Sequence, residues 1–254
     1  MQPGEVVRDG RYPSWIPTSR RRGVLGEEVA DYVRDLILTG SLRSGEKIDQ
    51  AAVSEAMDVS RSPIREALVI LSREGLVALT PRRGASVVQL SREDIIDHYA
   101  LFGVVAGRAA SLAAQLLPPA SVTELRAVHR RFTDVEGADD LDPEVLQQLN
   151  HDFHRIINLA APGRTRWLLG YLERSVPANY FEFADGWNVV AVTHHRNILE
   201  AIVAGDADGA RGAMEAHLLA SGEAATAQLE ARGFFDPAPD DLYVDGAAGA
   251  EGAG

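Results

Sequence analysis

The sequence predicts a mainly α-helical protein built from two domains, and three observations lead to this fold class. The 254 residues suffice for two hydrophobic cores of ordinary size. Apolar residues recur at the spacing of helical faces along most of the chain, whereas runs typical of strands are confined to a short region before residue 91. Residues 1–19 and 236–254 have little to bury, so we expect a flexible N-terminal arm and a disordered tail.

The first predicted domain, residues 20–90, begins with three helices. Apolar positions across 25–37 share one helical face, and a shorter helix covers 52–57. A third helix follows, for which either Ser60 or Ser62 can act as the N-cap.

Proline and glycine mark the limits of this third helix and of the hairpin after it. Pro63 lies in the first turn, where a missing N–H does no harm, and Gly75 stands where a helix commonly ends. Two β-prone runs, 76–80 and 85–90, flank the turn PRRG at 81–84. Three helices followed by a hairpin predict a winged helix-turn-helix.

Residues 91–235 predict an all-α antiparallel helical bundle. Ser91 and Asp94 resemble one capping box, and Ser121 and Glu124 form another. Prolines and glycines interrupt the helical pattern between segments. The predicted helices begin near residues 91, 121, 142, 164, 189 and 206, which makes a bundle of about six or seven helices.

The composition excludes several classes of protein. The chain has no cysteine, so disulfides, thiolate metal sites and iron–sulfur clusters are impossible, and a reducing compartment fits. No apolar run reaches the roughly 18 to 20 residues of a membrane span, and the N-terminal residues lack the pattern of a secretory signal. We therefore expect a cytoplasmic protein without a membrane partner.

The charge is distributed unevenly along the chain. A formal net charge of −12 argues at first sight against nucleic acid, because phosphate contacts come mainly from lysine and arginine. Residues 20–85, however, contain eleven basic and ten acidic residues, a net charge of +1, which leaves −13 for the remainder. Lys47 is the only lysine, so the basic groups are nearly all guanidinium groups, which suit bidentate contacts with phosphate or guanine.

Two arginines in the third predicted helix are candidates for DNA contacts. At about 100° per residue, Arg61 and Arg65 lie together to one side of the apolar stripe. A major groove accepts such a helix. A solvated helix whose arginines pair with Glu66 or Glu74 explains the same spacing. The two arginines at the hairpin tip are either phosphate or minor-groove contacts or ordinary turn residues.

Four motifs in this domain, GSLRSGEKI, VSRSPIREAL, LSREGLV and PRRGASV, follow one another within residues 24–90. Together they resemble the N-terminal domain of GntR-family bacterial transcription regulators. The resemblance implies that Arg61 and Arg65 contact operator DNA and that Gly84 permits the wing turn. Ala51 and Ala52 replace residues that are often polar or basic in relatives, which weakens the expectation of a contact from the second helix. The predicted DNA-binding residues are Ser60, Arg61, Ser62, Arg65, Arg82, Arg83 and Gly84.

Three histidines in the second domain are candidate metal ligands: His154, His195 and His217. Neutral imidazoles bind zinc, nickel, copper or iron(II), and imidazoles from different helices can converge inside a bundle. Asn150, one helical turn before His154, could add an oxygen ligand. Taken without a family, this spacing favours separate surface or core histidines.

Residues 95–232 resemble the FadR-type effector domain (FCD type) of the same regulators. In that domain D-x-x-x-H, then H-R-x-I-L-x-A-I-x-x-G-D, then a late H-L mark a metal site beside a small-molecule cavity. The resemblance places His154, His195 and His217 in the three histidine positions and Asn150 in the carboxylate position. Loss of that negative charge favours imidazole-preferring metals, so we expect zinc or nickel as a divalent cofactor. The adjacent histidines at 151 and 194 are expected to be non-ligands.

The resemblance also bears on the effector. Relatives commonly carry arginine and glutamate on the inner face of the first effector helix, where this chain has Phe102 and Ala106. This departure favours a more apolar ligand than a simple carboxylate. The predicted effector pocket contains Phe102, Arg108 and Tyr180, although the aromatic cluster at 180–187 is also explained by core packing.

The function predicted from these features is that of a homodimeric, ligand-responsive repressor. It binds pseudo-palindromic operator DNA, since two rigidly spaced copies read twice as much sequence, and it senses a small-metabolite effector through a metal-assisted pocket. An alternative from another class is a metal-dependent hydrolase-like enzyme, with Asp152 or Glu215 as general base. A DNA-binding architectural protein without an effector cavity is the third interpretation.

Overall fold

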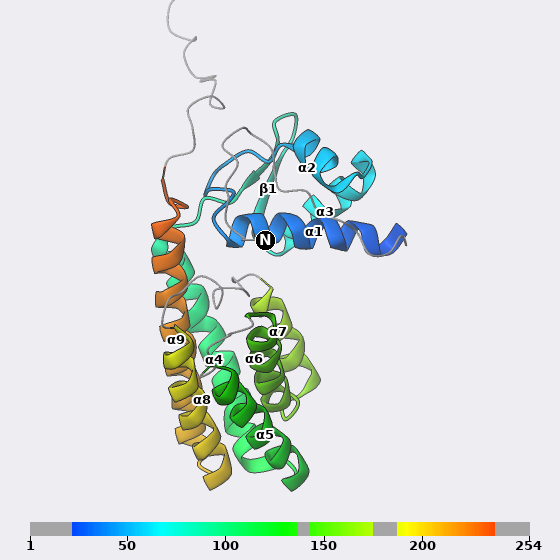
Figure 1. Cartoon of the computed structure of the whole chain (residues 1–254). Coiled ribbons are helices and arrows are strands. Elements are labelled where there is room, and N and C mark those ends of the chain that lie inside the picture. Colours follow the sequence, from blue (N-terminus) through cyan, green and yellow to red (C-terminus); the bar gives the residue numbers. More distant parts are fainter. Residues whose placement is uncertain (1–21, 137–142, 175–186, 237–254) are drawn as a thin grey trace, which may run out of the picture.

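The structure of the chain, a computed structural model, describes residues 22–136, 143–174 and 187–236. An N-terminal winged helix-turn-helix is followed by a bundle of helices, which confirms the predicted fold class (Figure 1). The predicted arm at 1–19 and the predicted tail beyond Asp236 lie outside the described residues.

The elements follow one another in the predicted order. The winged unit consists of α1 (Arg22–Leu38), α2 (Gln50–Met57), α3 (Arg61–Arg73), β1 (Val77–Thr80) and β2 (Gly84–Val87). The bundle consists of α4 (Arg92–Leu116), α5 (Pro119–Glu136), α6 (Pro143–Asn158), α7 (Gly163–Glu173), α8 (Trp187–Ala204) and α9 (Ala207–Ala231).

Local capping determines how α2 leads into α3. The Asp49 carboxylate accepts hydrogen bonds from two backbone N–H groups in the first turn of α2. Asp58, with a left-handed backbone (φ 50°), then ends α2 and turns the chain. Ser60 is the N-cap residue of α3, so the other candidate, Ser62, lies inside the helix.

The antiparallel hairpin of β1 and β2 forms the wing. Its tip contains two residues with a left-handed backbone, Arg82 (φ 65°) and Gly84 (φ 93°). Glycine adopts this conformation without steric cost, as the sequence analysis expects, whereas Arg82 has no such sequence signal. Lys47 bridges to Ser86, so the segment before α2 lies beside the wing.

A buried ion pair joins α1 to the end of α3. Arg34 donates to Glu74 through Nε and Nη2 at 3.0 and 2.9 Å, and it also pairs with Asp31. The Arg34 and Glu74 side chains are only 11% and 8% exposed. Although burial opposes the shift, the two carboxylates raise the pKa of Arg34. This bidentate pair fixes the base of α3 against α1.

The long helices α4 and α9 pack together along the length of the bundle (Figure 1). The predicted cap of α4 is present: the Asp94 N–H donates to Ser91 Oγ at 3.1 Å, and the Ser91 N–H donates to Asp94 Oδ2 at 2.8 Å. Glycine permits the close approach of α9, because a Cβ at Gly222 would lie 2.7 Å from Tyr99 Cβ. The other helices pack around this pair.

Helix α4 is the one helix in the described part of the chain that is long and apolar enough to cross a membrane. In the structure it contacts α6, α7, α8 and α9. Its apolar composition is therefore explained by its position as the central helix of the bundle.

The predicted capping box at 121–124 is wrong. Helix α5 begins at Pro119, two residues earlier, and the Val122 N–H donates to the Pro118 carbonyl at 3.1 Å. Proline suits the first position of a helix because its missing N–H needs no partner there. The two prolines thus end α4 and start α5.

The C-terminal ends of α7 and α9 both contact the winged unit. The Tyr171 hydroxyl on α7 donates to the Arg73 carbonyl at the end of α3, at 2.7 Å. Just beyond α9, the Phe234 carbonyl accepts from the Ser44 N–H at 3.0 Å. The two halves of the molecule are therefore joined at two places.

Candidate functional site

Helix α3 buries one face and exposes the arginines predicted to contact DNA. Ile64, Leu68 and Leu71 are buried, while Arg61 and Arg65 are exposed. Neither arginine has an ion-pair partner among the described residues. Two guanidinium groups thus project from the surface of the helix with their donors available to a ligand.

The acidic residues proposed as alternative partners are engaged elsewhere. Glu74 pairs with Arg34 and lies 3.7 Å from Arg174. The carboxylate of Glu66 lies against α1, where a Cβ at Gly26 would be 3.0 Å from Glu66 Oε2. Within the described residues, the interpretation of α3 as a solvated helix with internal ion pairs finds no support.

Further donors lie around the arginines of α3. Ser60 and Ser62 are exposed, and the Ser60 side chain makes no capping hydrogen bond. A helix N-terminus of this kind favours a phosphate group. At the wing tip, the predicted residues at 82–84 are all exposed.

Lys47 is a basic residue that the sequence analysis does not assign to a site. It is exposed, and its Cε would lie 3.8 Å from a Cβ at Gly84. Its bridge to Ser86 places it at the wing, a tertiary contact that the local sequence does not predict. Lys47 thus adds a positive charge beside the two wing arginines.

Three histidines from three helices converge inside the bundle. His154 lies on α6, His195 on α8 and His217 on α9, and one ring nitrogen of each lies within 4.8 Å of the others. The Nε2 atoms of His154 and His217 are 3.3 Å apart. Two imidazole nitrogens on a tetrahedral zinc are about 3.4 Å apart when each Zn–N bond is about 2.1 Å. The spacing therefore suits a shared metal ion.

Burial keeps these imidazoles neutral. Burial, with a smaller effect of His151, lowers the pKa of His154 to about 4. Burial and then the neighbouring histidines lower the pKa values of His195 and His217 well below the usual range. Neutral imidazole is the form that coordinates metals.

Unsatisfied polar atoms on α6 and α8 fit a metal ion. Both ring nitrogens of His195 and the amide Oδ1 of Asn150 are buried without a hydrogen-bond partner. Buried polar atoms are nearly always paired in folded proteins. Asn150 precedes His154 by one turn of α6, and no carboxylate belongs to the group within the described residues. Imidazole nitrogens with a neutral oxygen suit zinc or nickel better than oxygen-preferring cations.

Aromatic rings fix the orientation of His195. Phe153 stacks on its ring with a centroid separation of 4.3 Å, and Phe132 lies at 5.1 Å. His194 lies beside the group, its ring centroid 5.7 Å from that of His217, whereas His151 faces Glu173 at the surface. The histidine group is therefore held in an apolar, aromatic environment.

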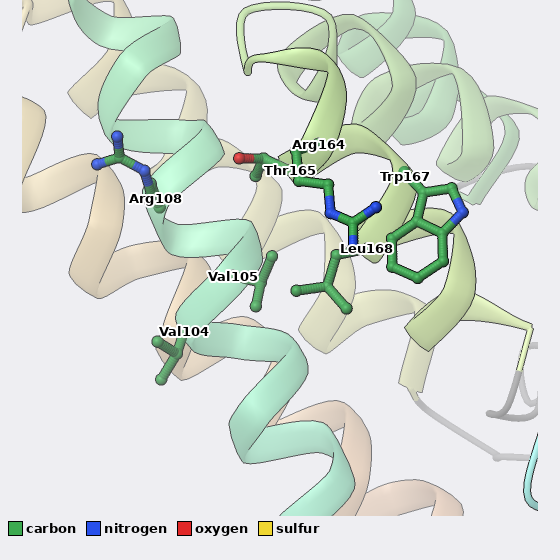
Figure 2. A pocket seen from close by; sticks show the side chains of 7 residues that line it. All are labelled: Val104, Val105, Arg108, Arg164, Thr165, Trp167 and Leu168. Carbon is green, nitrogen blue, oxygen red and sulfur yellow. The ribbon is translucent and has the colours of Figure 1, made fainter.

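The residues predicted for an effector pocket are not all brought together. Phe102 is partly buried against the core, while Arg108 is exposed and lines a pocket of about 400 Å³ between α4 and α7 (Figure 2). Tyr180 lies outside the described residues. The pocket opens on the outer surface and is lined by Val104, Val105, Arg108, Arg164, Thr165, Trp167 and Leu168.

The two residues nominated as a general base lie away from the histidine nitrogens. Asp152 accepts a hydrogen bond from Arg155 Nε at 3.2 Å, and Glu215 packs against Gly107 of α4. Neither belongs to the histidine group. The hydrolytic arrangement considered from sequence is therefore not assembled by the described residues.

Comparisons with known proteins agree with both halves of the fold. Residues 25–87 match the family described as bacterial regulatory proteins, gntR family, and residues 97–220 match the FCD domain. A regulator described as an uncharacterized HTH-type transcriptional regulator in an unstable DNA locus of Streptomyces ambofaciens is 33% identical over 195 residues. That match covers 74% of this chain and 79% of the relative.

Two further comparisons extend this picture. A probable D-xylose utilization operon transcriptional repressor of Paenarthrobacter nicotinovorans is 27% identical, covering 80% of this chain and 90% of the relative. The solved structure of E. coli McbR/YncC has a TM-score of 0.61 at 19% identity, over 81% of this chain and 98% of that one. The structural match shows a shared fold.

Proposed function

The chain belongs to the GntR family of transcriptional regulators and carries an FCD domain, and from this premise we propose a ligand-responsive repressor that binds a pseudo-palindromic operator as a homodimer. Residues 20–90 bind DNA, and residues 91–235 dimerise and bind a small-metabolite effector. The protein works in the cytoplasm. Its family is one of regulators, so it is not an enzyme.

The observation that carries this proposal is the pair of exposed guanidinium groups on α3. Arg61 and Arg65 have no ion-pair partner in the described chain, so their donors are free for guanine or phosphate oxygens. Ser60 and Ser62 supply hydroxyl donors at the start of the helix. The wing residues Arg82, Arg83 and Gly84, with Lys47, contact phosphate or the minor groove. (These roles rest on the exposure of the residues and on their family positions.)

A selection of bound genomic DNA fragments tests this role. Wild-type protein is expected to enrich a pseudo-palindromic sequence, and mobility shifts on that sequence give its affinity. The double variant R61A/R65A is expected to lose the sequence-specific shift. The matched control R126A/R130A removes two exposed arginines of α5 and should bind as wild type does. Sequence-specific binding retained by R61A/R65A overturns the assignment.

Asn150, His154, His195 and His217 are the residues that would hold a divalent metal, zinc or nickel. When bound, the metal supplies a Lewis-acidic site at which an oxygen atom of the effector can coordinate. The buried His195 is held by Phe153 and Phe132, so its nitrogens are preorganised for coordination. The partly apolar surroundings at Phe102 fit an effector that also carries apolar groups.

Elemental analysis of protein purified without a metal-affinity tag tests the metal assignment. Wild type is expected to contain about one equivalent of zinc or nickel per chain. The variant His195→Ala should lose it, whereas His151→Ala, which removes an exposed histidine of α6, should keep it. Equal metal content in wild type and His195→Ala contradicts the assignment.

The repressor role is supported by the name of the P. nicotinovorans relative. A repressor occupies its operator until the effector binds, and an effector must favour one placement of the DNA-binding domains to change occupancy. Fusion of the enriched operator to a reporter in a heterologous host tests this role. Expression of the protein should lower reporter output, and a rise in output indicates an activator instead.

A further inference from the structure

The four residues that follow α9, residues 232–235, turn back from the bundle onto the winged unit. Helix α9 ends on the side of the bundle that is nearest the winged unit (Figure 1). Gly233 has a left-handed backbone (φ 72°), and the Phe234 N–H donates to the Leu229 carbonyl at 2.9 Å. This is the hydrogen-bond pattern of a Schellman motif, which ends a helix and redirects the chain. The glycine therefore turns the chain off the axis of α9 directly before Phe234.

The loop between α1 and α2 receives these residues. Phe234 is only 1% exposed, and a Cβ at Gly40 of the loop would lie 3.7 Å from Phe234 Cβ. The Ser44 N–H donates to the Phe234 carbonyl at 3.0 Å. Arg232 donates through Nη1 to the Thr39 carbonyl at 2.8 Å, just beyond the end of α1, where a positive charge is favourable. A buried aromatic ring and two hydrogen bonds thus hold the winged unit to the end of α9.

The linker between the two domains is held at the same loop. Ser44 Oγ donates to the Leu90 carbonyl at 3.1 Å and accepts from the Leu90 N–H at 2.8 Å. At the start of α4, Arg92 pairs with Glu230 of α9, and its Cζ lies 6.0 Å from the centroid of the Phe235 ring. The linker and the end of α9 are therefore tied to each other and to the winged unit.

We propose that residues 232–235 form a clasp that positions the winged unit for DNA. The proposal rests on the homodimer and the operator of the proposed function. Helix α9 (Ala207–Ala231) is continuous and packs along α4, so a winged unit clasped to its end is oriented by the bundle. In a dimer, two clasps fix the distance between the two α3 helices, and both half-sites are bound together only when their spacing matches that distance. Arg232 and Phe234 are positioning residues, which act without touching DNA.

A distance measurement within one chain tests the clasp directly. The sequence contains no cysteine, so E55C on α2 and D134C on α5, both at exposed positions, can carry a pair of spin labels. An excess of unlabelled wild type leaves at most one labelled chain per dimer, and pulsed dipolar spectroscopy then gives the distance within that chain. We expect a narrow distribution in the wild-type background and one about twice as wide or more with Phe234→Ala. Leu159→Ala, at an exposed apolar residue just after α6, should keep the narrow distribution, and equal widths for wild type and Phe234→Ala overturn the proposal.

The spacing of the operator half-sites gives a readout that a merely structural role would not change. Wild type should bind the enriched operator about thirtyfold more tightly than the same half-sites moved apart by about 2 bp, a fifth of a helical turn. Phe234→Ala should bind the enriched operator about tenfold more weakly and should distinguish the two spacings by less than about threefold. Its affinity for a single half-site should equal that of wild type, because α3 is unchanged. An unaltered spacing preference overturns the proposal, and so does an equal loss of affinity for single half-sites.

Arg232→Ala keeps the proposal testable if Phe234→Ala does not fold. Arg232 is exposed, so its removal leaves the core intact. The variant should widen the distance distribution less than Phe234→Ala does and should reduce the spacing preference about threefold. Arg211→Ala, exposed on the same helix, is the matched control. If Phe234→Ala is unfolded, an Arg232→Ala variant that equals wild type in both measurements overturns the proposal.

The two measurements also separate the clasp from the proposed function. If wild type enriches no operator but Phe234→Ala widens the distance distribution, the clasp survives and the regulator does not. If Phe234→Ala keeps both operator binding and the spacing preference of wild type, the regulator survives and the clasp does not.

Discussion

The buried histidines determine how the fold responds to acid. Burial lowers the pKa of His154 to about 4 and lowers the pKa values of His195 and His217 well below the usual range, whereas the unfolded chain titrates near the ordinary value of 6.5. Below about pH 6.5, the unfolded chain therefore binds more protons than the folded chain does. The free energy of unfolding therefore falls as the pH drops from about 6.5 towards 4.

We expect the urea midpoint of the metal-free protein to decrease across this window. The variant His154→Gln removes one of the groups and should show a shallower pH dependence. His151→Gln, at an exposed histidine three residues away, should keep the wild-type slope. A midpoint that is constant between pH 7 and pH 5 contradicts the assigned burial.

The ion pair between α1 and α3 gives a second prediction for single residues. Glu74→Ala leaves the buried Arg34 with only the exposed carboxylate of Asp31, and should lower the free energy of unfolding by about 3 kcal/mol. Glu55→Ala, at an exposed position on α2, should change it by less than about 0.5 kcal/mol. Urea denaturation measures both, and similar losses for the two variants would show that the pair is not structural.

At the scale of elements, α7 links the bundle to the end of α3. The Tyr171 hydroxyl donates to the Arg73 carbonyl, and Arg174 follows α7 beside Glu74. Tyr171→Phe should therefore raise hydrogen–deuterium exchange in the last turn of α3 and leave α2 unchanged. Arg166→Ala, exposed on the same helix, is the control. Unchanged exchange in Tyr171→Phe would mean that this contact does not hold α3.

Helix boundaries follow from the sequence where a local signal exists. Ser91 and Asp94 cap α4 as predicted. Two of the glycines that interrupt the helical pattern, Gly205 and Gly233, have φ of 71° and 72° and follow the ends of α8 and α9. The predicted start of α5 was wrong because two start signals compete there. The capping box begins at Ser121, whereas the helix begins two residues earlier with a proline at its first position. Local patterns decide such cases only when one signal stands alone.

Sites built from distant elements could not be derived from local patterns. The histidines of α6, α8 and α9 meet only because the bundle packs, and their spacing alone favoured separate histidines. The expectation that the three histidines share one metal site came from the family resemblance. Lys47 lies at the wing because of its β-bridge to Ser86 of β2, which is a tertiary contact. Arg82 adopts a left-handed backbone although it is not a glycine. No periodic pattern in the sequence predicts either feature.

At the scale of the whole molecule, charge separates the two halves. Residues 20–85 carry +1 within a chain of −12, so attraction to DNA is confined to the winged unit. The logarithm of operator affinity should fall linearly with the logarithm of salt concentration. In a dimer, Arg83→Ala removes two phosphate contacts and should reduce this slope by about 2. Arg126→Ala, exposed on α5, should leave the slope unchanged, and equal slopes for wild type and Arg83→Ala contradict the wing contact.

Hydroxyl-radical footprinting of the full chain on its enriched operator tests the central claim most directly. Two copies of α3 that each enter a major groove predict two protected half-sites related by a two-fold axis and centred one or more helical turns apart. The variant R61A/R65A should give no protection at the same protein concentration. Protection of both half-sites by R61A/R65A would contradict the claim that the exposed arginines of α3 read the DNA.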